Sequence, residues 1–155
     1  MDYQTLSDYS HGWIFRHRDM PVPDALMADI KPLSEASALQ YWRQNISKEA
    51  THASHFLGDD WPSQNGIWHT KGEWQAQWES DDPELPEGLD FDDWEANTHV
   101  FFCYDCHHVV QTTWATFRQC WKNFLFYDEE PILIGKRRLQ VARFHSDGTF
   151  DIGAH

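Results

Sequence analysis

Residues 103–108 read CYDCHH and combine thiol and imidazole side chains, the groups with which proteins bind zinc and haem. The CxxCH spacing is that of a covalent haem attachment, which is made outside the reducing cytosol, whereas this sequence shows no export signal. A closed zinc site needs four convergent ligands, and the chain has no second CxxC and no HxxxH. We therefore expect no cofactor, and keep zinc as the alternative, with these ligands: Cys103, Cys106, His107 and His108.

The geometry of a strand bears on the same motif. Residues three apart in a continuous strand point to opposite faces, about 10 Å from each other. Only a turn at Tyr104 and Asp105 would bring the two sulfurs together, for a metal or for a redox dithiol, and Asp105 favours such a turn through its side chain. The plainest interpretation is a hairpin turn that contains cysteine.

Other catalytic patterns are weak or absent. His52 and His55 lie one turn apart on an expected helix and could share a metal with Asp59 or Asp60, but Ala53 stands where a metalloprotease needs its glutamate. No GxSxG, P-loop or GxGxxG sequence occurs. The sequence thus favours a protein that is not an enzyme.

A second group of residues suggests recognition rather than catalysis. Five tryptophans lie in a middle segment with few aliphatic side chains, where they either pin a long loop or form plates for a cationic peptide, a methylated amine or a sugar. The stretch WESDDPELPEGLDFDDWE adds nine carboxylates, and no Lys or Arg occurs between Gly72 and Phe117. We expect a basic protein or peptide to bind here, with a small molecule or sugar on the tryptophans as the alternative. The candidate residues are Trp61, Trp68, Trp74, Trp78, Trp94, Glu79, Asp81 and Asp82.

Composition limits the partners. The formal charge is −13, from 12 basic and 25 acidic residues, which repels nucleic acid and anionic lipid. No apolar run approaches the ~20 residues of a membrane span. Three cysteines without an export signal fit free thiols in the cytoplasm, and either a monomer or a homodimer is compatible with the pattern.

These residues must be positioned by an α+β fold in one domain, residues 1–155. We expect a mainly antiparallel sheet of about five or six strands with two or three helices packed on it and an irregular, acidic, Trp-rich segment. GWIFRHRD, THVFFCY, HHVVQT, PILIG and RRLQVARFHS are predicted strands. A short helix follows Pro23, longer ones lie near 34–57 and 114–126 with caps at Ser34 and Thr113, and GEWQAQWES supplies a turn or two.

Two hairpins are specified in more detail. Gly135 and Lys136 suit a two-residue loop. In the final hairpin a three-residue loop with Gly148 left-handed pairs Phe144 with Phe150, Ala142 with Ile152 and Arg143 with Asp151, whereas a two-residue loop would oppose unlike side chains.

The two ends of the chain also resemble a known type of protein. GWIFRHRDMPVPD, WKNFLFYDEEPILIGKRR and QVARFHSDGTFDIG are similar to a family of small uncharacterised bacterial proteins that is filed as a domain of unknown function. This resemblance implies a small soluble protein and transfers no catalytic residue.

Overall fold

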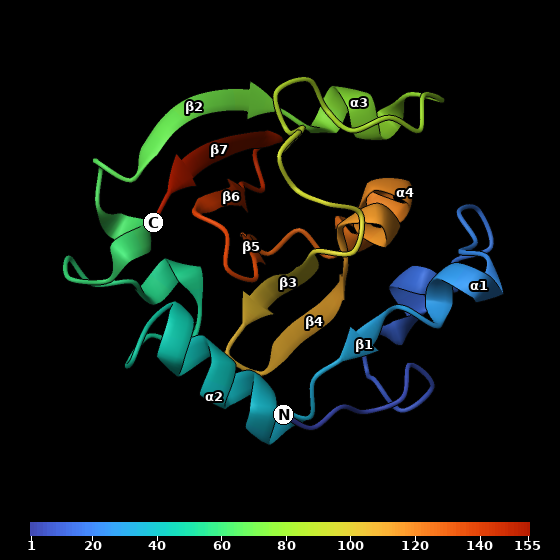
Figure 1. Ribbon diagram of the computed structural model, residues 1–155, viewed down its shortest axis with the longest axis horizontal. Coiled ribbons are helices and arrows are strands. Elements are labelled where there is room, and N and C mark those ends of the chain that lie inside the picture. The colour runs from blue at the N-terminus through green and yellow to red at the C-terminus, as the bar shows by residue number, and fades with distance from the viewer.

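The computed structural model describes all 155 residues, and its centre is a seven-stranded sheet in which every pairing is antiparallel (Figure 1). The strands lie in the order β1-β4-β3-β5-β6-β7-β2. The α+β prediction is therefore confirmed, with slightly more strands than expected. In chain order the strands are β1 (Lys31–Pro32), β2 (Trp68–Glu73), β3 (His99–Asp105), β4 (His108–Thr113), β5 (Ile132–Gly135), β6 (Gln140–Phe144) and β7 (Thr149–Ala154).

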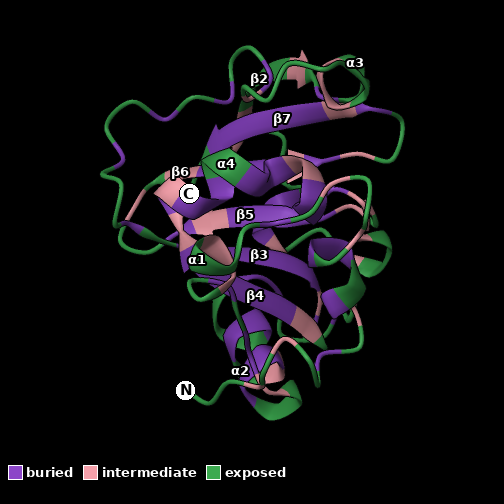
Figure 2. Ribbon diagram, turned by 90° about the vertical axis from the view of Figure 1, so that its right-hand side faces the viewer, coloured by how far each residue is buried: buried purple, intermediate pink, exposed green.

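Two helices cover opposite faces of this sheet. Along β3, Val100, Phe102 and Tyr104 face a core that includes α4 (Trp114–Phe124) and the N-terminal segment. The alternate residues Phe101 and Cys103 face a smaller core beneath α2 (Glu35–Asn45). Because both faces are covered, the central strands are buried along almost their whole length (Figure 2). The remaining helical turns are α1 (Asp24–Met27), α3 (Gln75–Glu79) and the 3-10 turns η1 (Gly12–Phe15), η2 (Ala53–His55) and η3 (Trp61–Ser63).

The capping and register predictions are confirmed. The Ser34 hydroxyl accepts the Ser37 amide at the start of α2, and the Thr113 hydroxyl accepts the Thr116 amide at the start of α4. The last hairpin pairs the expected residues, and Gly148 has φ +92°.

Two predictions on helices and strands at the N-terminal side are wrong. GWIFRHRD does not form a strand: Gly12–Phe15 form the 3-10 turn η1, which the hydrogen bond from the Arg16 amide to the Trp13 carbonyl closes. The helix expected to reach residue 57 ends at Asn45. Beyond it, the Ser47 hydroxyl accepts the Ala50 amide and the His52 ring accepts the Ser54 amide, so polar side chains hold turns there in place of a helix.

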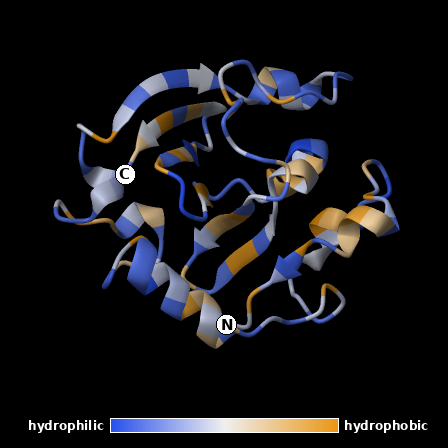
Figure 3. Ribbon diagram, in the orientation of Figure 1, coloured by the Kyte–Doolittle hydropathy of each residue, from blue (hydrophilic) through white to orange (hydrophobic).

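Two further differences concern the sheet. Strand β2 was not expected, because none of its residues is hydrophobic on the hydropathy scale (Figure 3). It is held at the sheet edge by its pairing with β7. The connection between β5 and β6 is longer than two residues, since Ile134 pairs with Val141.

Candidate functional site

The five candidate tryptophans are anchored inside the protein. Trp61, Trp74 and Trp94 are buried, while Trp68 and Trp78 are half-buried. They are also divided between the two faces, with Trp61 and Trp68 on the α2 side and the other three in the α4 core. Each indole N–H is donated to a group of the protein at 2.7–3.0 Å: Asn45 O, Pro62 O, His145 O, Lys122 O and Gln140 Oε1 for Trp61, Trp68, Trp74, Trp78 and Trp94.

Residues 79–95, here called the acidic segment, are held against the α4 core by four apolar side chains spaced along the segment. Leu89, Phe91 and Trp94 are buried in that core, and Leu85 packs against it. The carboxylates between them are all exposed, namely Glu79, Asp81, Asp82, Glu84, Glu87, Asp90, Asp92, Asp93 and Glu95. Only Asp90 lies within 4 Å of a cationic group, Arg118. The segment therefore presents fixed negative charge that the protein itself does not neutralise.

Hydrogen bonds hold the first turn of the acidic segment in place. The Asp82 carboxylate accepts the Glu84 amide at 3.0 Å, and this hydrogen bond lowers the pKa of Asp82. The Lys122 ammonium donates to the Ser80 carbonyl at 2.7 Å. Asp81 and Asp82 thus stand on a defined turn next to the end of α4.

One tryptophan is exposed, Trp13, which the strand prediction for GWIFRHRD did not single out. Trp13 is 46% exposed, whereas the other eight tryptophans are buried or half-buried. Its ring lies 6.2 Å from Phe126, which in turn meets Trp78 edge-on at 5.2 Å. These three residues, here called the aromatic strip, connect η1 to α3 and so reach Glu79. No sequence signal marks Trp13, because its exposure depends on the local turn of η1.

The CYDCHH turn separates its two cysteines from its two histidines. An irregularity in the β3–β4 pairing between Cys103 and Asp105 places both Cys103 and Cys106 in the core beneath α2. His107 is exposed and lies 3.3 Å from Glu35. His108 turns to the other side of the sheet and stacks on His11 at 4.0 Å. The structure contains no group of three or more His, Cys, Asp or Glu side chains arranged to hold a metal ion.

The stacked pair of His11 and His108 forms a small polar cluster of its own. Tyr9 and Tyr127 flank the pair, with ring centroids 5.7 Å and 4.4 Å from His11. Burial lowers the pKa of both histidines, and Asp105 opposes this effect. The Nδ1 atoms of both histidines and the Tyr9 hydroxyl are buried without a hydrogen-bond partner. The cluster is thus aromatic and partly buried, and its histidines are favoured in the neutral form.

The three thiols are expected to be unreactive in the native protein. Cys103, Cys106 and Cys120 are free and buried. Burial raises the pKa of all three, to about 12 for Cys120, so almost no thiolate forms at neutral pH. Titration with a disulfide reagent should give a slow native reaction and three thiols in denaturant. Fast native modification that disappears in Cys106→Ser would contradict this prediction and would mean that the turn opens.

His52 and His55 do not form the helical pair that the sequence suggested. His52 caps the 3-10 turn η2 and His55 is its last residue, with ring centroids 6.4 Å apart. The His52 ring also forms hydrogen bonds with the Ser54 amide and the Glu129 carbonyl. Asp60 accepts the Leu57 amide. These side chains are engaged in holding the local chain.

The comparisons with known proteins give a family and nothing more specific. No curated protein and no solved structure is significantly similar to the chain. None of the helices is both long and apolar enough to cross a membrane. The resemblance at the two ends of the chain is confirmed and extends over nearly all of it: the family model described as "Protein of unknown function (DUF2947)" matches residues 3–153, and the chain belongs to that family.

Proposed function

We propose that the protein is a non-enzymatic interaction module that binds a basic protein or peptide on the acidic segment and the aromatic strip. The observation that carries the proposal is the exposure of Trp13 alone among nine tryptophans, at the end of a strip that reaches the acidic segment. An exposed indole, connected through Phe126 and Trp78 to a segment of unpaired carboxylates, suits a partner with Arg or Lys side chains. Both an aromatic face and a carboxylate attract such a cation.

The fixed position of the carboxylates supports the same proposal. A cationic partner would meet carboxylates on a backbone that Leu89, Phe91 and Trp94 already anchor, so little backbone entropy is lost on binding. The overall charge of −13 would also accelerate its approach at low salt. The affinity for the cationic partner is then expected to fall as the salt concentration rises, because salt screens the attraction between the charges.

The two alternatives have less support. A metal-dependent protein at Cys103, Cys106, His107 and His108 would require the turn to rearrange, because these side chains point to different surroundings. A sugar or small-molecule site on the five candidate tryptophans is opposed by the burial of Trp61, Trp74 and Trp94 and by the division of the five between the two faces of the sheet. Three free, buried thiols are consistent with the reducing cytoplasm, where we place the protein.

The proposal can be tested with short Arg- and Lys-rich peptides, with and without an aromatic residue, by isothermal titration calorimetry at low and moderate salt. Trp13→Ala should weaken binding about fivefold by removing a cation-π contact. The double variant Asp81→Asn/Asp82→Asn should weaken it several-fold and reduce the salt dependence.

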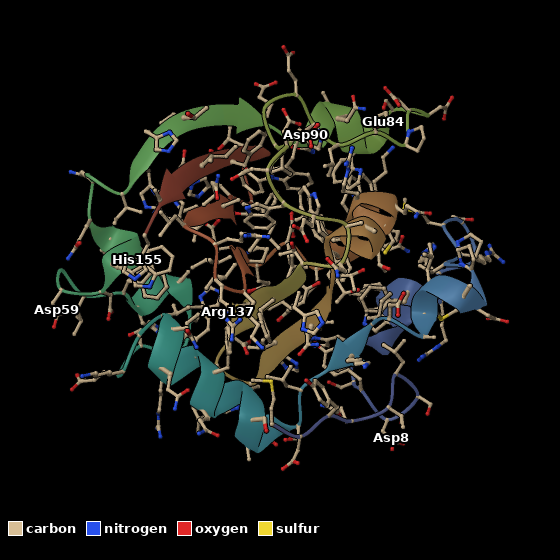
Figure 4. All side chains as sticks on the ribbon, in the orientation of Figure 1. Asp8, Asp59, Glu84, Asp90, Arg137 and His155 are labelled. Atoms are coloured by element: carbon tan, nitrogen blue, oxygen red, sulfur yellow. The ribbon has the colours of Figure 1, made fainter.

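The matched control is the double variant Asp8→Asn/Asp59→Asn. Asp8 and Asp59 lie away from Glu84 and Asp90, the labelled residues of the acidic segment (Figure 4). The control changes the net charge by the same amount and should leave affinity nearly unchanged. Equal losses in the two double variants would reduce the interaction to nonspecific attraction and overturn the proposal.

A further inference from the structure

A groove of about 610 Å³ lies between α2 and the turn that joins β5 to β6. This volume falls within the range of small-molecule sites. The start of β3 and the C-terminal end of β7 complete its walls, and two of the lining residues, Arg137 and His155, are labelled in Figure 4. The groove does not involve the acidic segment or the aromatic strip.

The charge of the groove is opposite to that of the protein. Lys136, Arg137 and Arg138 line it, and none of its lining residues is Asp or Glu, although the chain has 25 acidic residues. None of the three cations forms an ion pair with a carboxylate, in contrast to Arg143 and Lys71, which both pair with Asp151. The groove therefore presents three cationic side chains that form no ion pair within the protein.

The cationic turn is held in a costly backbone conformation. Arg137 has φ +60°, in the left-handed region where glycine or asparagine is usual. The Arg138 amide closes the turn on the Gly135 carbonyl at 3.1 Å, and the Arg138 guanidinium donates to the Thr98 hydroxyl at 3.2 Å. The Nε of Arg138 is buried without a partner. Arginine at the strained position 137, next to the unpartnered Nε of Arg138, does not stabilise the fold and is therefore a candidate for a role in binding.

The remaining walls of the groove contain two stacked aromatic pairs, mostly buried, and a hydrogen-bonding side chain. Tyr41 stacks on Phe101 at 4.3 Å, and Trp61 stacks on His155 at 4.3 Å. Burial raises the pKa of Tyr41, so its hydroxyl remains a neutral donor. Gln111 is 7% exposed, and its amide oxygen accepts the Tyr3 hydroxyl while its amide nitrogen has no partner in the protein.

We propose that this groove binds a small organic anion in which a phosphate or carboxylate is attached to a planar ring. The anionic group lies at Lys136, Arg137 and Arg138, where guanidinium groups can form charge-assisted hydrogen bonds. The ring lies along the stacked aromatic wall, and Gln111 donates to a ring or linker oxygen.

The test uses 1-naphthyl phosphate, 1-naphthoate, neutral 1-naphthol and inorganic phosphate, titrated into the full chain and followed by amide chemical shifts. The two ring-bearing anions should produce saturable shifts at Lys136, Arg138 and His99 in the low millimolar range or tighter. Naphthol and inorganic phosphate should each bind at least about tenfold more weakly, since each lacks one half of the ligand. The tighter of the two anions identifies the preferred head group.

Arg137→Gly separates binding from folding. This variant should bind the preferred anion at least about tenfold more weakly, because one charged contact is lost. Its melting temperature should stay the same or rise, since glycine relieves the left-handed strain. Arg18→Gly, at an exposed residue without a hydrogen bond or ion pair to other side chains, removes the same charge and should leave affinity unchanged.

Three results would overturn the proposal: no saturable shift with either anion, binding of naphthol as tight as that of the anions, or equal weakening by Arg137→Gly and Arg18→Gly. Each of these results is independent of whether basic peptides bind to the acidic segment.

Discussion

Trp94→Ala is expected to lower the free energy of unfolding by about 3–5 kcal/mol, the usual cost of truncating a buried tryptophan. The Trp94 ring packs against Phe91 at 4.5 Å and against Trp114 at 5.1 Å, and its indole N–H donates to Gln140 at 3.0 Å. It also fills the space over Gly135, where an added Cβ would lie 2.6 Å from the ring. Removing the ring would therefore leave a cavity and detach the acidic segment from β5 and β6.

Urea unfolding followed by circular dichroism measures this loss, and Trp13→Ala is the matched control. Because Trp13 is 46% exposed, its truncation should change stability by no more than about 0.5 kcal/mol. Hydrogen exchange of the amides of residues 89–98 should accelerate in Trp94→Ala beyond the change expected from global stability. A small loss in Trp94→Ala, comparable to that of Trp13→Ala, would show that Trp94 does not hold the segment.

Local chemistry explains which parts of the fold were predictable. Ser34 and Thr113 cap helices through hydrogen bonds that span three residues, so their sequence neighbourhood contains the whole signal. The register of the last hairpin follows from the loop around Gly148, because a shift by one residue would exchange the faces of Phe144 and Phe150. Such features depend on contacts between residues that are close in the chain.

The incorrect predictions concern features that distant residues decide. Apart from Trp68, strand β2 is polar or glycine, and it is held by its pairing with β7, with Gly72 allowing Phe150 to lie against the strand. The segment after Asn45 has helix-compatible residues, but Trp42 donates to the Ala50 carbonyl and thereby holds a turn there. Secondary-structure propensities read from a short stretch of sequence take no account of such partners, which lie outside the stretch.

In the candidate sites, too, features set by the residue itself were predictable and features set by distant residues were not. That Glu79, Asp81 and Asp82 would be exposed could be predicted from their charge alone. The exposure of Trp13 and the anchoring of Trp78 could not, because they depend on η1 and on the Lys122 carbonyl at the end of α4. The divergence of the CYDCHH side chains likewise results from the irregular β3–β4 pairing and from the stacking of His108 on His11.

The other large effect is expected at Asp151, the most buried carboxylate in an ion pair. Its side chain is 3% exposed. One of its oxygens accepts Arg143 Nε at 2.7 Å and His145 Nε2 at 2.9 Å, and Lys71 Nζ lies 3.7 Å from the other. Burial alone would raise the pKa of Asp151, but the hydrogen bonds from His145 and Arg143 outweigh it, so the pKa is lowered. The native protein thus stabilises the charged form.

Asp151→Asn should therefore destabilise the protein by about 2–4 kcal/mol at neutral pH, because Arg143 and His145 lose their shared anionic partner inside the sheet. Asp59→Asn is the control, since this exposed carboxylate has no such contact, and it should change stability by no more than about 0.5 kcal/mol.

The pH dependence of this difference tests the mechanism. An unfolded aspartate has a pKa of about 3.9, and the native value lies lower, so the unfolded chain binds more protons between the two values. The contribution of Asp151 is then complete above about pH 4 and is lost as the pH falls through the native pKa. Urea unfolding at pH 7 and at several values below pH 4 should show the wild-type protein losing stability faster than Asp151→Asn, so that the two curves converge. If the difference stayed constant down to the lowest pH at which both proteins fold, its origin would be packing of the side chain and not the charge of Asp151.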